Sequence, residues 1–404
     1  MVDRSIRKLI VAEAKRQAET INLIPSENFI SPEVLRALGS VFTNKYAEGY
    51  SAARYYGGNQ VVDQVEELAK SRALDLFCLA PNKWQVNVQP YSGSTANMAV
   101  YVALVPVGGK IMGLELNMGG HLTHGHKASF VSKAWQTASY GLDRRTELLD
   151  YGAILKLARK EKPKLIVAGY TAYPRIIDFK KFRAIADAAH AYLMVDMSHF
   201  AGLVAGEAYP SPFAYADVVT TTTHKTLRGP RGAMIFSRSN LSPSIDHAVF
   251  PGLQGGPHVN QIAGTAAALL EAKQASFKLY AKQIIKNAKV LAGALQKEKW
   301  RIVSGGTDTH LLLVDVAARG ISGKEASDRL ERQNIIVNKN TIPFDTRSPV
   351  NPSGIRLGTP TLTTRGMGEK EMKVIARLIS EVLLKNAKVT TEVKKLCKKF
   401  PLKF

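Results

Sequence analysis

One lysine stands where an α/β protein would place a reactive amine. The segment TTTTHKTLRGPRG, residues 220–232, follows an apolar run that predicts a strand, and Lys225 is flanked there by threonine and histidine. Ligand sites of open α/β sheets lie beyond the carboxyl ends of the strands. An amine in such surroundings can attack an aldehyde and form a Schiff base. A lone lysine is more often an ordinary surface residue, so this hypothesis needs partners.

Asp196 is the first partner, since it ends the apolar run of YLMVDMSHF. A carboxylate in that position can keep the ring nitrogen of pyridoxal 5′-phosphate (PLP) protonated, which makes the ring a better electron sink. The alternative is an aspartate that caps the N-terminus of the next helix.

A second partner is the segment YSGSTANMAVY, residues 91–101, where small hydroxylated residues and glycine lead into a helical pattern. The backbone N–H groups and the positive dipole end at such a helix start favour a phosphate. A simple serine or threonine cap without a ligand is the alternative. The sequence has no Walker motif and no GxGxxG pattern that would indicate a nucleotide.

The segment GGHLTHGH contains His121, His124 and His126, which raises the question of a metal site. No acidic or cysteine ligand stands close by, and the spacing is not the helical i, i+4 pair of zinc proteases. A histidine can equally lie flat against an aromatic cofactor or transfer a proton. We therefore expect no metal here.

Two further segments are typical of recognition of a small anion. Arg356 lies in SGIRLGTPTLTTRG, where a guanidinium fork could bind a carboxylate with two hydrogen bonds. The stretch NKYAEGYSAARYYGG, residues 44–58, gathers Glu48, Tyr46 and Tyr56 in a segment too polar for a core strand. Surface loops with routine salt bridges are the alternative for each.

Alternating strand and helix patterns predict an α/β fold with a mainly parallel sheet. A Gly/Pro-rich loop near Phe250 and a small-residue helix then lead to a smaller C-terminal domain. We expect domains at 1–275 and 276–404. The predicted strands are 164–169, 192–196, 217–221, 232–236, 309–316 and 335–338, and the predicted helices are 179–190, 262–272, 280–297, 323–333 and 370–384.

The composition is that of an ordinary globular protein, with 404 residues, 45% hydrophobic residues and a formal net charge of +22. No apolar stretch reaches the roughly 20 residues of a membrane span and no signal peptide is apparent, so we expect a cytoplasmic protein. Two cysteines argue against a disulfide framework. The positive charge and the basic end KNAKVTTEVKKLCKKFPLKF leave nucleic-acid binding open as a secondary property, although a solvated helix or a frayed tail is the simpler interpretation.

Taken together, these segments resemble serine hydroxymethyltransferase, from LIPSENFISP at Leu23 to GIRLGTPTLTTRG at Gly354. The most diagnostic segments are NKYAEGY, RYYGG, SGSTAN, GGHLTHG, VDMSHFAGL, THKTLRGPRG, FPGLQGGPH and VNKNTIP. The departures are modest: the chain has Thr171 where the family often has serine, and Pro25 where it often has alanine. The resemblance implies a type I PLP fold with a seven-stranded, mostly parallel sheet, a small C-terminal α+β domain, and a homodimer whose subunits share the active site.

The resemblance also implies roles for individual residues. Lys225 would carry PLP as an aldimine, Asp196 would pair with the pyridine nitrogen, and His121 would stack on the ring. Glu48 would transfer protons around the hydroxymethyl group and Arg356 would bind the substrate carboxylate. The other implied site residues are Ser92, Gly93, Ser94 and His224 for the phosphate; Thr171, His199, Ser26 and Arg231 along the cofactor or substrate; Tyr46, Tyr56, Gly255 and Gly256 from the neighbouring subunit; and Leu116, Gly120 and Asn340 for the folate.

The implied reaction converts L-serine and tetrahydrofolate reversibly into glycine and 5,10-methylenetetrahydrofolate, a step of one-carbon metabolism and glycine biosynthesis. It would pass through a PLP external aldimine and a glycine quinonoid. Two alternatives remain: a folate-independent threonine or allo-threonine aldolase, and a nucleic-acid-binding protein on the same scaffold. The sequence does not distinguish tetrahydrofolate from a modified pterin, or a dimer from a tetramer.

Overall fold

A computed structural model of the chain describes residues 3–402. The residues group into two compact units. The large unit is residues 28–282, and the small unit combines residues 1–27 with 283–404 as far as they are described. The predicted domain limits at 1–275 and 276–404 stay a prediction. No helix in the described part of the chain is long and apolar enough to cross a membrane.

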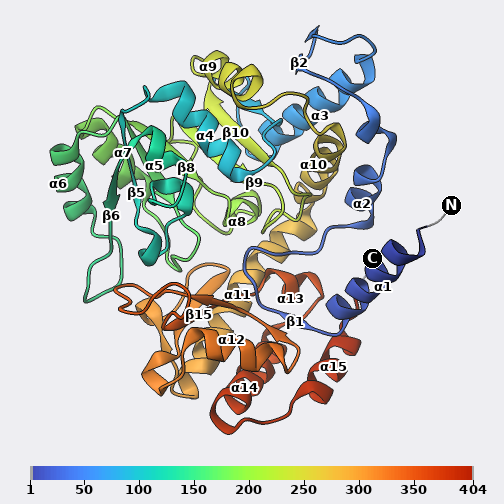
Figure 1. Ribbon diagram of the computed structural model, residues 1–404, viewed down its shortest axis with the longest axis vertical. Helices are drawn as coiled ribbons and strands as arrows, with labels where there is room; N and C mark the ends of the chain where they lie inside the picture. The colour runs from blue at the N-terminus through green and yellow to red at the C-terminus, as the bar shows by residue number, and fades with distance from the viewer. Residues whose placement is uncertain (1–2, 403–404) are drawn as a thin grey trace. The chain divides into compact units, whose positions relative to one another are not determined.

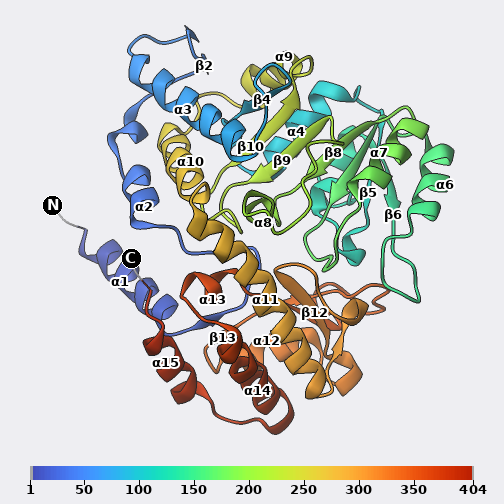
Figure 2. The ribbon, with the colours of Figure 1, turned by 180° about the vertical axis from the view of Figure 1, so that it is seen from behind.

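A seven-stranded sheet forms the centre of the large unit, in the order β4-β10-β9-β8-β7-β5-β6 (Figures 1 and 2). The five strands from β9 to β6 run parallel, whereas β10 runs antiparallel to both β9 and β4. The sheet strands are β4 (Trp84–Asn87), β5 (Lys110–Leu114), β6 (Gln136–Tyr140), β7 (Leu165–Gly169), β8 (Tyr192–Asp196), β9 (Val218–Thr222) and β10 (Ala233–Arg238), and a separate hairpin pairs β2 (Gly49–Tyr50) with β3 (Ala53–Arg54).

Helices cover this sheet. Every residue of β7 is buried, and Leu165 and Val167 share one apolar cluster with Ala96 and Val100 of α4, as strands covered on both faces require. The helix α7 starts at the cap Asp178, whose carboxylate accepts the backbone N–H of Lys181, and buries Phe182. The helices are α2 (Pro32–Leu38), α3 (Gln60–Leu76), α4 (Gly93–Leu104), α5 (Val131–Ala134), α6 (Tyr151–Glu161), α7 (Phe179–Ala188), α8 (Ala201–Ala205), α9 (Ser242–His247) and α10 (Val259–Ala272), with shorter turns η1 (Val41–Asn44), η2 (Leu116–Met118), η3 (Leu122–His124) and η4 (Ala248–Leu253).

The small unit has its own core around an antiparallel sheet of order β11-β12-β15-β14. The N-terminal segment joins it through β1, which pairs in parallel with β13. Its elements are α1 (Arg4–Ala18), β1 (Ile21–Asn22), β11 (Arg301–Ile302), η5 (Val303–Gly305), β12 (Leu311–Asp315), η6 (Ala317–Arg319), α12 (Gly323–Glu331), β13 (Ile335–Ile336), β14 (Asn338–Asn340), β15 (Gly354–Gly358), α13 (Pro360–Thr364), α14 (Glu369–Lys385) and α15 (Thr390–Lys399), and α11 (Ala275–Lys297) contains the boundary between the units.

The structure corrects two details of the sequence analysis. The predicted strand 335–338 is two short strands, β13 and β14, which belong to different sheets. Within the basic end of the chain, residues 390–399 form an ordered helix, α15, that buries Val393 and Cys397. Arg365 fixes this helix to the N-terminal segment, because its guanidinium donates to the carbonyls of Cys397 (2.8 Å) and Ala18 (3.0 Å). It is therefore not a frayed tail.

Candidate active site

The parallel pairing of β7, β8 and β9 brings the predicted catalytic residues to one edge of the sheet. Gly169 lies opposite Asp196, and Asp196 lies opposite Thr220, so the carboxyl ends of these strands are in register. Lys225 follows β9 by one turn, and its ammonium donates to Thr222 Oγ1 (2.8 Å). Both predicted charges, Lys225 and Asp196, are close enough to His121 to act on its pKa.

Asp196 is buried and fully engaged in hydrogen bonds. Its Oδ2 accepts from Asn97 Nδ2 (2.9 Å) and His124 Nε2 (3.0 Å), and its Oδ1 accepts from the backbone N–H of Ser198 (3.1 Å). Burial alone would raise the pKa of this carboxyl, but the hydrogen bond from His124, together with that from Asn97, holds it well below its usual range. Asp196 is therefore a fixed anion. It does not cap α8, whose N-cap residue is Phe200.

His124 and Asn97 are site residues that the sequence analysis did not assign. His124 Nδ1 accepts the backbone N–H of His121 (3.3 Å), so the proton sits on Nε2 and points at Asp196. Asn97 is 1% exposed and also accepts from Thr220 Oγ1 (2.7 Å). The available signal was a polar asparagine within the apolar helix pattern that follows Ser92.

The ring of His121 is held in place from the same network. Asn97 Nδ2 donates to Thr123 Oγ1 (2.9 Å), and His121 Nδ1 lies 2.7 Å from the same hydroxyl and accepts the N–H of Thr123 (3.1 Å). Burial lowers the pKa of His121 to about 4. The imidazole is thus neutral near pH 7, which suits a plate against an aromatic ring.

The lysine loop is fastened at its backbone. The carbonyl of Lys225 accepts from Asn28 Nδ2 (3.0 Å) and from the backbone N–H of Arg228 (3.1 Å). Asn28 also donates to the hydroxyl of Tyr280 (2.8 Å). These bonds fix where the side chain of Lys225 begins, so a short loop after β9 can present its amine reproducibly.

The start of α4 has the features of a phosphate site. Ser92 caps this helix by accepting the N–H of Thr95, and a Cβ on Gly93 would come 2.7 Å from Thr222 Cγ2. Only glycine fits there without displacement. His224, which precedes Lys225, has a buried Nδ1 atom with no hydrogen-bond partner within residues 3–402. A buried polar atom without a partner calls for an explanation, such as a ligand that is bound there in the working protein. The donor set fits the phosphate of PLP.

The partly buried rings of His121 and His224 predict a pH-dependent stability. Burial, with the charges of Lys225 and Arg231, lowers the pKa of His224 to about 3, and His121 falls to about 4. Between pH 6.5 and these values the unfolded chain binds protons that the folded chain does not, so stability falls as the pH falls. From pH 7 to 5 each histidine is expected to reduce the free energy of unfolding by about 1–2 kcal/mol.

Urea unfolding of the cofactor-free protein at pH 7, 6 and 5 measures this effect. The variant His224→Gln should lose less stability over the same range than the parent, because glutamine takes up no proton in either state. An equal loss in both proteins would contradict a neutral, partly buried His224.

A second group of predicted residues lies together around the β2–β3 hairpin. The rings of Tyr46 and Tyr56 meet edge to face at 5.1 Å. A Cβ on Gly255 would come 2.9 Å from Glu48 Oε1, and one on Gly256 would come 3.2 Å from the Tyr46 ring. Glu48 therefore lies in the same group as Tyr46, Tyr56, Gly255 and Gly256, the residues that the resemblance assigns to the active site of the neighbouring subunit.

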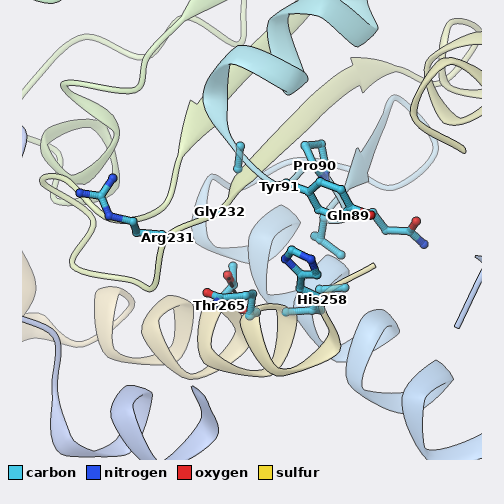
Figure 3. A pocket seen from close by; sticks show the side chains of 11 residues that line it. Gln89, Pro90, Tyr91, Arg231, Gly232, His258 and Thr265 are labelled. Atoms are coloured by element: carbon cyan, nitrogen blue, oxygen red, sulfur yellow. Dashed lines mark hydrogen bonds between the residues drawn. The ribbon is translucent and has the colours of Figure 1, made fainter. Parts of the chain in front are cut away.

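Tyr91 connects this group with the start of α4. Its ring stacks on His258 at 4.3 Å and its hydroxyl donates to the carbonyl of Gly256 (2.7 Å), as the close-up in Figure 3 shows for the ring pair. The cavity beside them measures only about 10 Å³, room for roughly one water. Arg231 lines its far side, with the guanidinium directed away from the rings (Figure 3).

The remaining predicted residues lie in both units. In the large unit, Thr171 follows β7 and its hydroxyl donates to the carbonyl of Gly120 (2.7 Å), while Leu116 starts η2. His199 is buried, and its carbonyl accepts from Thr226 Oγ1 (3.0 Å). The small unit contains Ser26, Asn340 on β14, and Arg356 on β15, whose Nε donates to Asn338 Oδ1 (3.1 Å).

The described residues contain no group of three or more histidine, cysteine, aspartate or glutamate side chains placed to hold a metal ion. His121 and His124 instead use ring nitrogens within the Asp196 network.

Comparisons with known proteins decide what this arrangement belongs to. A model of the serine hydroxymethyltransferase family matches residues 1–379. The chain is similar to proteins named serine hydroxymethyltransferase from Koribacter versatilis, 53% identical, and Acidobacterium capsulatum, 52% identical, each over 99% of this chain and 94% of the relative. A third, from Myxococcus xanthus, is 51% identical over 99% of this chain and 96% of the relative.

The chain belongs to the serine hydroxymethyltransferase family. This membership confirms the predicted type I α/β fold, the class of PLP-dependent one-carbon transferase, and the use of PLP with tetrahydrofolate as co-substrate. It also confirms the predicted reaction, the interconversion of serine and glycine with the folate, and favours neither the aldolase nor the nucleic-acid-binding alternative.

Proposed function

We propose that Lys225, Asp196 and the residues around them hold PLP and carry serine hydroxymethyl transfer in this chain. The observation that supports this most strongly is the buried Asp196 anion, bound by His124 and Asn97 at the same sheet edge as Lys225. Bound PLP would supply an aldehyde for the lysine amine and an electron sink for the carbon that loses its hydroxymethyl group.

Each part of the site then has a distinct task. With PLP bound, Asp196 would keep a proton on the ring nitrogen and His121 would pack against the ring. Ser92, Gly93 and Ser94 offer the N-terminal N–H groups of α4 to the phosphate, and His224 Nδ1 gains a partner there. Thr171 and His199 would line the bound cofactor, and Tyr46, Gly255 and Gly256 of a second subunit would complete the phosphate site.

Substrate recognition is assigned to charged and polar groups. We assign the amino-acid carboxylate to Arg356, whose fork matches it in bidentate fashion. Ser26, Arg231 and Tyr56 are placed along the substrate. Leu116, Gly120 and Asn340 are assigned to the binding of the co-substrate, tetrahydrofolate or a related pterin.

Glu48 is proposed to take and return the proton at the hydroxyl oxygen of the hydroxymethyl group. Replacing it by glutamine keeps its size but removes the proton transfer, for which positioned groups contribute roughly 10²–10⁴-fold. In Glu48→Gln we therefore expect a fall of about a hundredfold or more in folate-dependent glycine formation, with the PLP absorbance of the protein retained.

The matched control is Glu67→Gln, which makes the same charge change at an exposed carboxylate of α3 that pairs with Lys70. It should keep the parent rate. A Glu48→Gln enzyme as fast as the control would remove Glu48 from the mechanism.

We also propose that the protein is a homodimer. Large apolar side chains stand exposed around α2, η1, the hairpin and α3, among them Val41 at 78%, Tyr55 at 81% and Val61 at 60%. Exposed apolar surface of this extent is typical of an interface. Tyr46 and Tyr56 are 55% and 43% exposed, so a partner could receive them. Sedimentation of the purified protein measures its mass in solution and so tests the dimer.

A cytoplasmic location stays a prediction.

A further inference from the structure

The guanidinium of Arg54 binds the backbone on both sides of Glu48. Its Nη1 donates to the carbonyl of Ala47 (3.0 Å) and to that of Gly49 (2.7 Å), and the side chain is only 4% exposed. The carbonyl of Glu48 itself accepts the N–H of Tyr55 (3.0 Å). Three consecutive carbonyls are thus fixed, and so is the direction in which the Glu48 side chain leaves the backbone.

The other donors of Arg54 attach this backbone to α3. Nη2 donates to Glu66 Oε2 (2.7 Å) and Nε to Asp63 Oδ1 (2.8 Å), and the Glu66 side chain is 3% exposed. Five N–H donors in one plane can satisfy two carbonyls and two carboxylates together. A lysine ammonium, with three donors on a flexible stem, does not match this arrangement.

Gln89 extends the network toward the phosphate-binding turn. Its Nε2 donates to the carbonyl of Gly49 (3.0 Å) and to Glu66 Oε1 (3.1 Å). Its own carbonyl accepts from Gln254 Nε2 (2.9 Å), and Gln254 Oε1 accepts the N–H of Tyr91 (3.0 Å). The Glu48 segment is therefore tied through buried polar groups to the residues that precede Ser92 and Gly255.

We infer that Arg54 is a positioning residue for the hydroxymethyl transfer, which holds Glu48 in its reactive geometry through the backbone carbonyls on either side of it. A buried ion pair contributes little net stability compared with apolar packing. We therefore assign this network the task of fixing the backbone around Glu48. The inference rests on the proposed role of Glu48, and it predicts that Arg54 acts only through that carboxylate.

The variant Arg54→Lys tests this in the PLP-loaded protein. A displacement of about 1 Å at a reacting group can cost roughly a hundredfold in rate. We therefore expect kcat for folate-dependent glycine formation to fall by about that factor, with little change in the KM for serine, because the carboxylate-binding group is untouched. Combined with Glu48→Gln, Arg54→Lys should cause no further loss, since coupled residues are not additive.

A readout independent of activity is hydrogen exchange of the peptide that spans residues 45–56. The amides of this segment should exchange faster in Arg54→Lys. The matched control is Arg183→Lys, because Arg183 likewise binds two carboxylates, Asp187 and Asp217, and the carbonyl of Ala191, but at α7. It should leave both the rate and this exchange unchanged.

Asp63→Asn is a milder second variant should Arg54→Lys fold poorly, since Asp63 is 27% exposed and amide oxygen still accepts. A several-fold loss of kcat that disappears in the Glu48→Gln background would support the inference. Parent-like turnover of Arg54→Lys, or losses that multiply with those of Glu48→Gln, would overturn it. Full activity of Glu48→Gln alone would instead overturn the role of Glu48 on which the inference rests.

Discussion

Replacing Lys225 by alanine is expected to reduce serine turnover by at least about a thousandfold, because proton transfer alone contributes roughly 10²–10⁴-fold and the amine also acts as nucleophile. The loop that carries Lys225 is held by Asn28 and by its own turn. We expect no neighbouring lysine to replace the amine of Lys225, so the turnover lost in Lys225→Ala should not be recovered.

The attachment can be followed without turnover. Borohydride reduces a Schiff base to a stable amine, so the treated parent protein should carry the cofactor on the peptide that contains Lys225, and the alanine variant should carry none. Lys278→Ala is a suitable control, since this lysine is exposed and pairs with Glu207. Covalent cofactor on another lysine of the parent, or near-parent turnover in Lys225→Ala, would contradict the assignment.

The second large effect is expected at Asp196. The variant Asp196→Asn keeps an oxygen for the bonds from Asn97 and His124 but removes the only charge that the buried network is built to hold. Loss of one partner of a buried charge pair costs about 2–5 kcal/mol, equivalent to roughly 30-fold to several thousandfold. We expect PLP affinity and turnover both to fall within that range, and the protein to remain folded.

A titration of the apoprotein with PLP, followed by absorbance, measures the affinity. Asp217→Asn is the matched control, because Asp217 is a half-buried carboxylate at the opposite end of the same strands, where it accepts from Arg183 and from the N–H of Leu193. Its loss should affect stability and leave PLP affinity unchanged. Equal PLP affinity in Asp196→Asn and the parent would show that the ring nitrogen does not use this carboxylate.

Much of the sheet was predictable because its strands are buried on both faces. Continuous apolar runs such as 192–196 match β8, and the helix pattern at 179–190 matches α7 except for its last residues. The apolar spacing of this segment was a sufficient signal, and the structure adds Asp178 as the side-chain cap that starts α7. The strands β4, β5 and β6 were not predicted. Exposure explains the miss only for the edge strand β6, which has a weak apolar pattern, because β4 and β5 are mostly buried.

The parts that escaped prediction depend on contacts between distant segments. Asn97 and His124 become site residues because the fold brings α4 and η3 to the end of β8, where both side chains donate to Asp196. Arg54 reads in sequence as a surface cation beside two tyrosines, yet its side chain is 4% exposed and paired with Glu66. Half of the residues of the helix α15 are charged, and its order depends on contacts with distant segments, among them the bond from Arg365 and the core around Val393.

The most direct test of the central claim is glycine formation from L-serine by the PLP-loaded protein, measured with and without tetrahydrofolate. The account predicts strong stimulation by the folate, with 5,10-methylenetetrahydrofolate formed in equal amount to glycine. Glycine formation that is indifferent to tetrahydrofolate while threonine is still cleaved would contradict it.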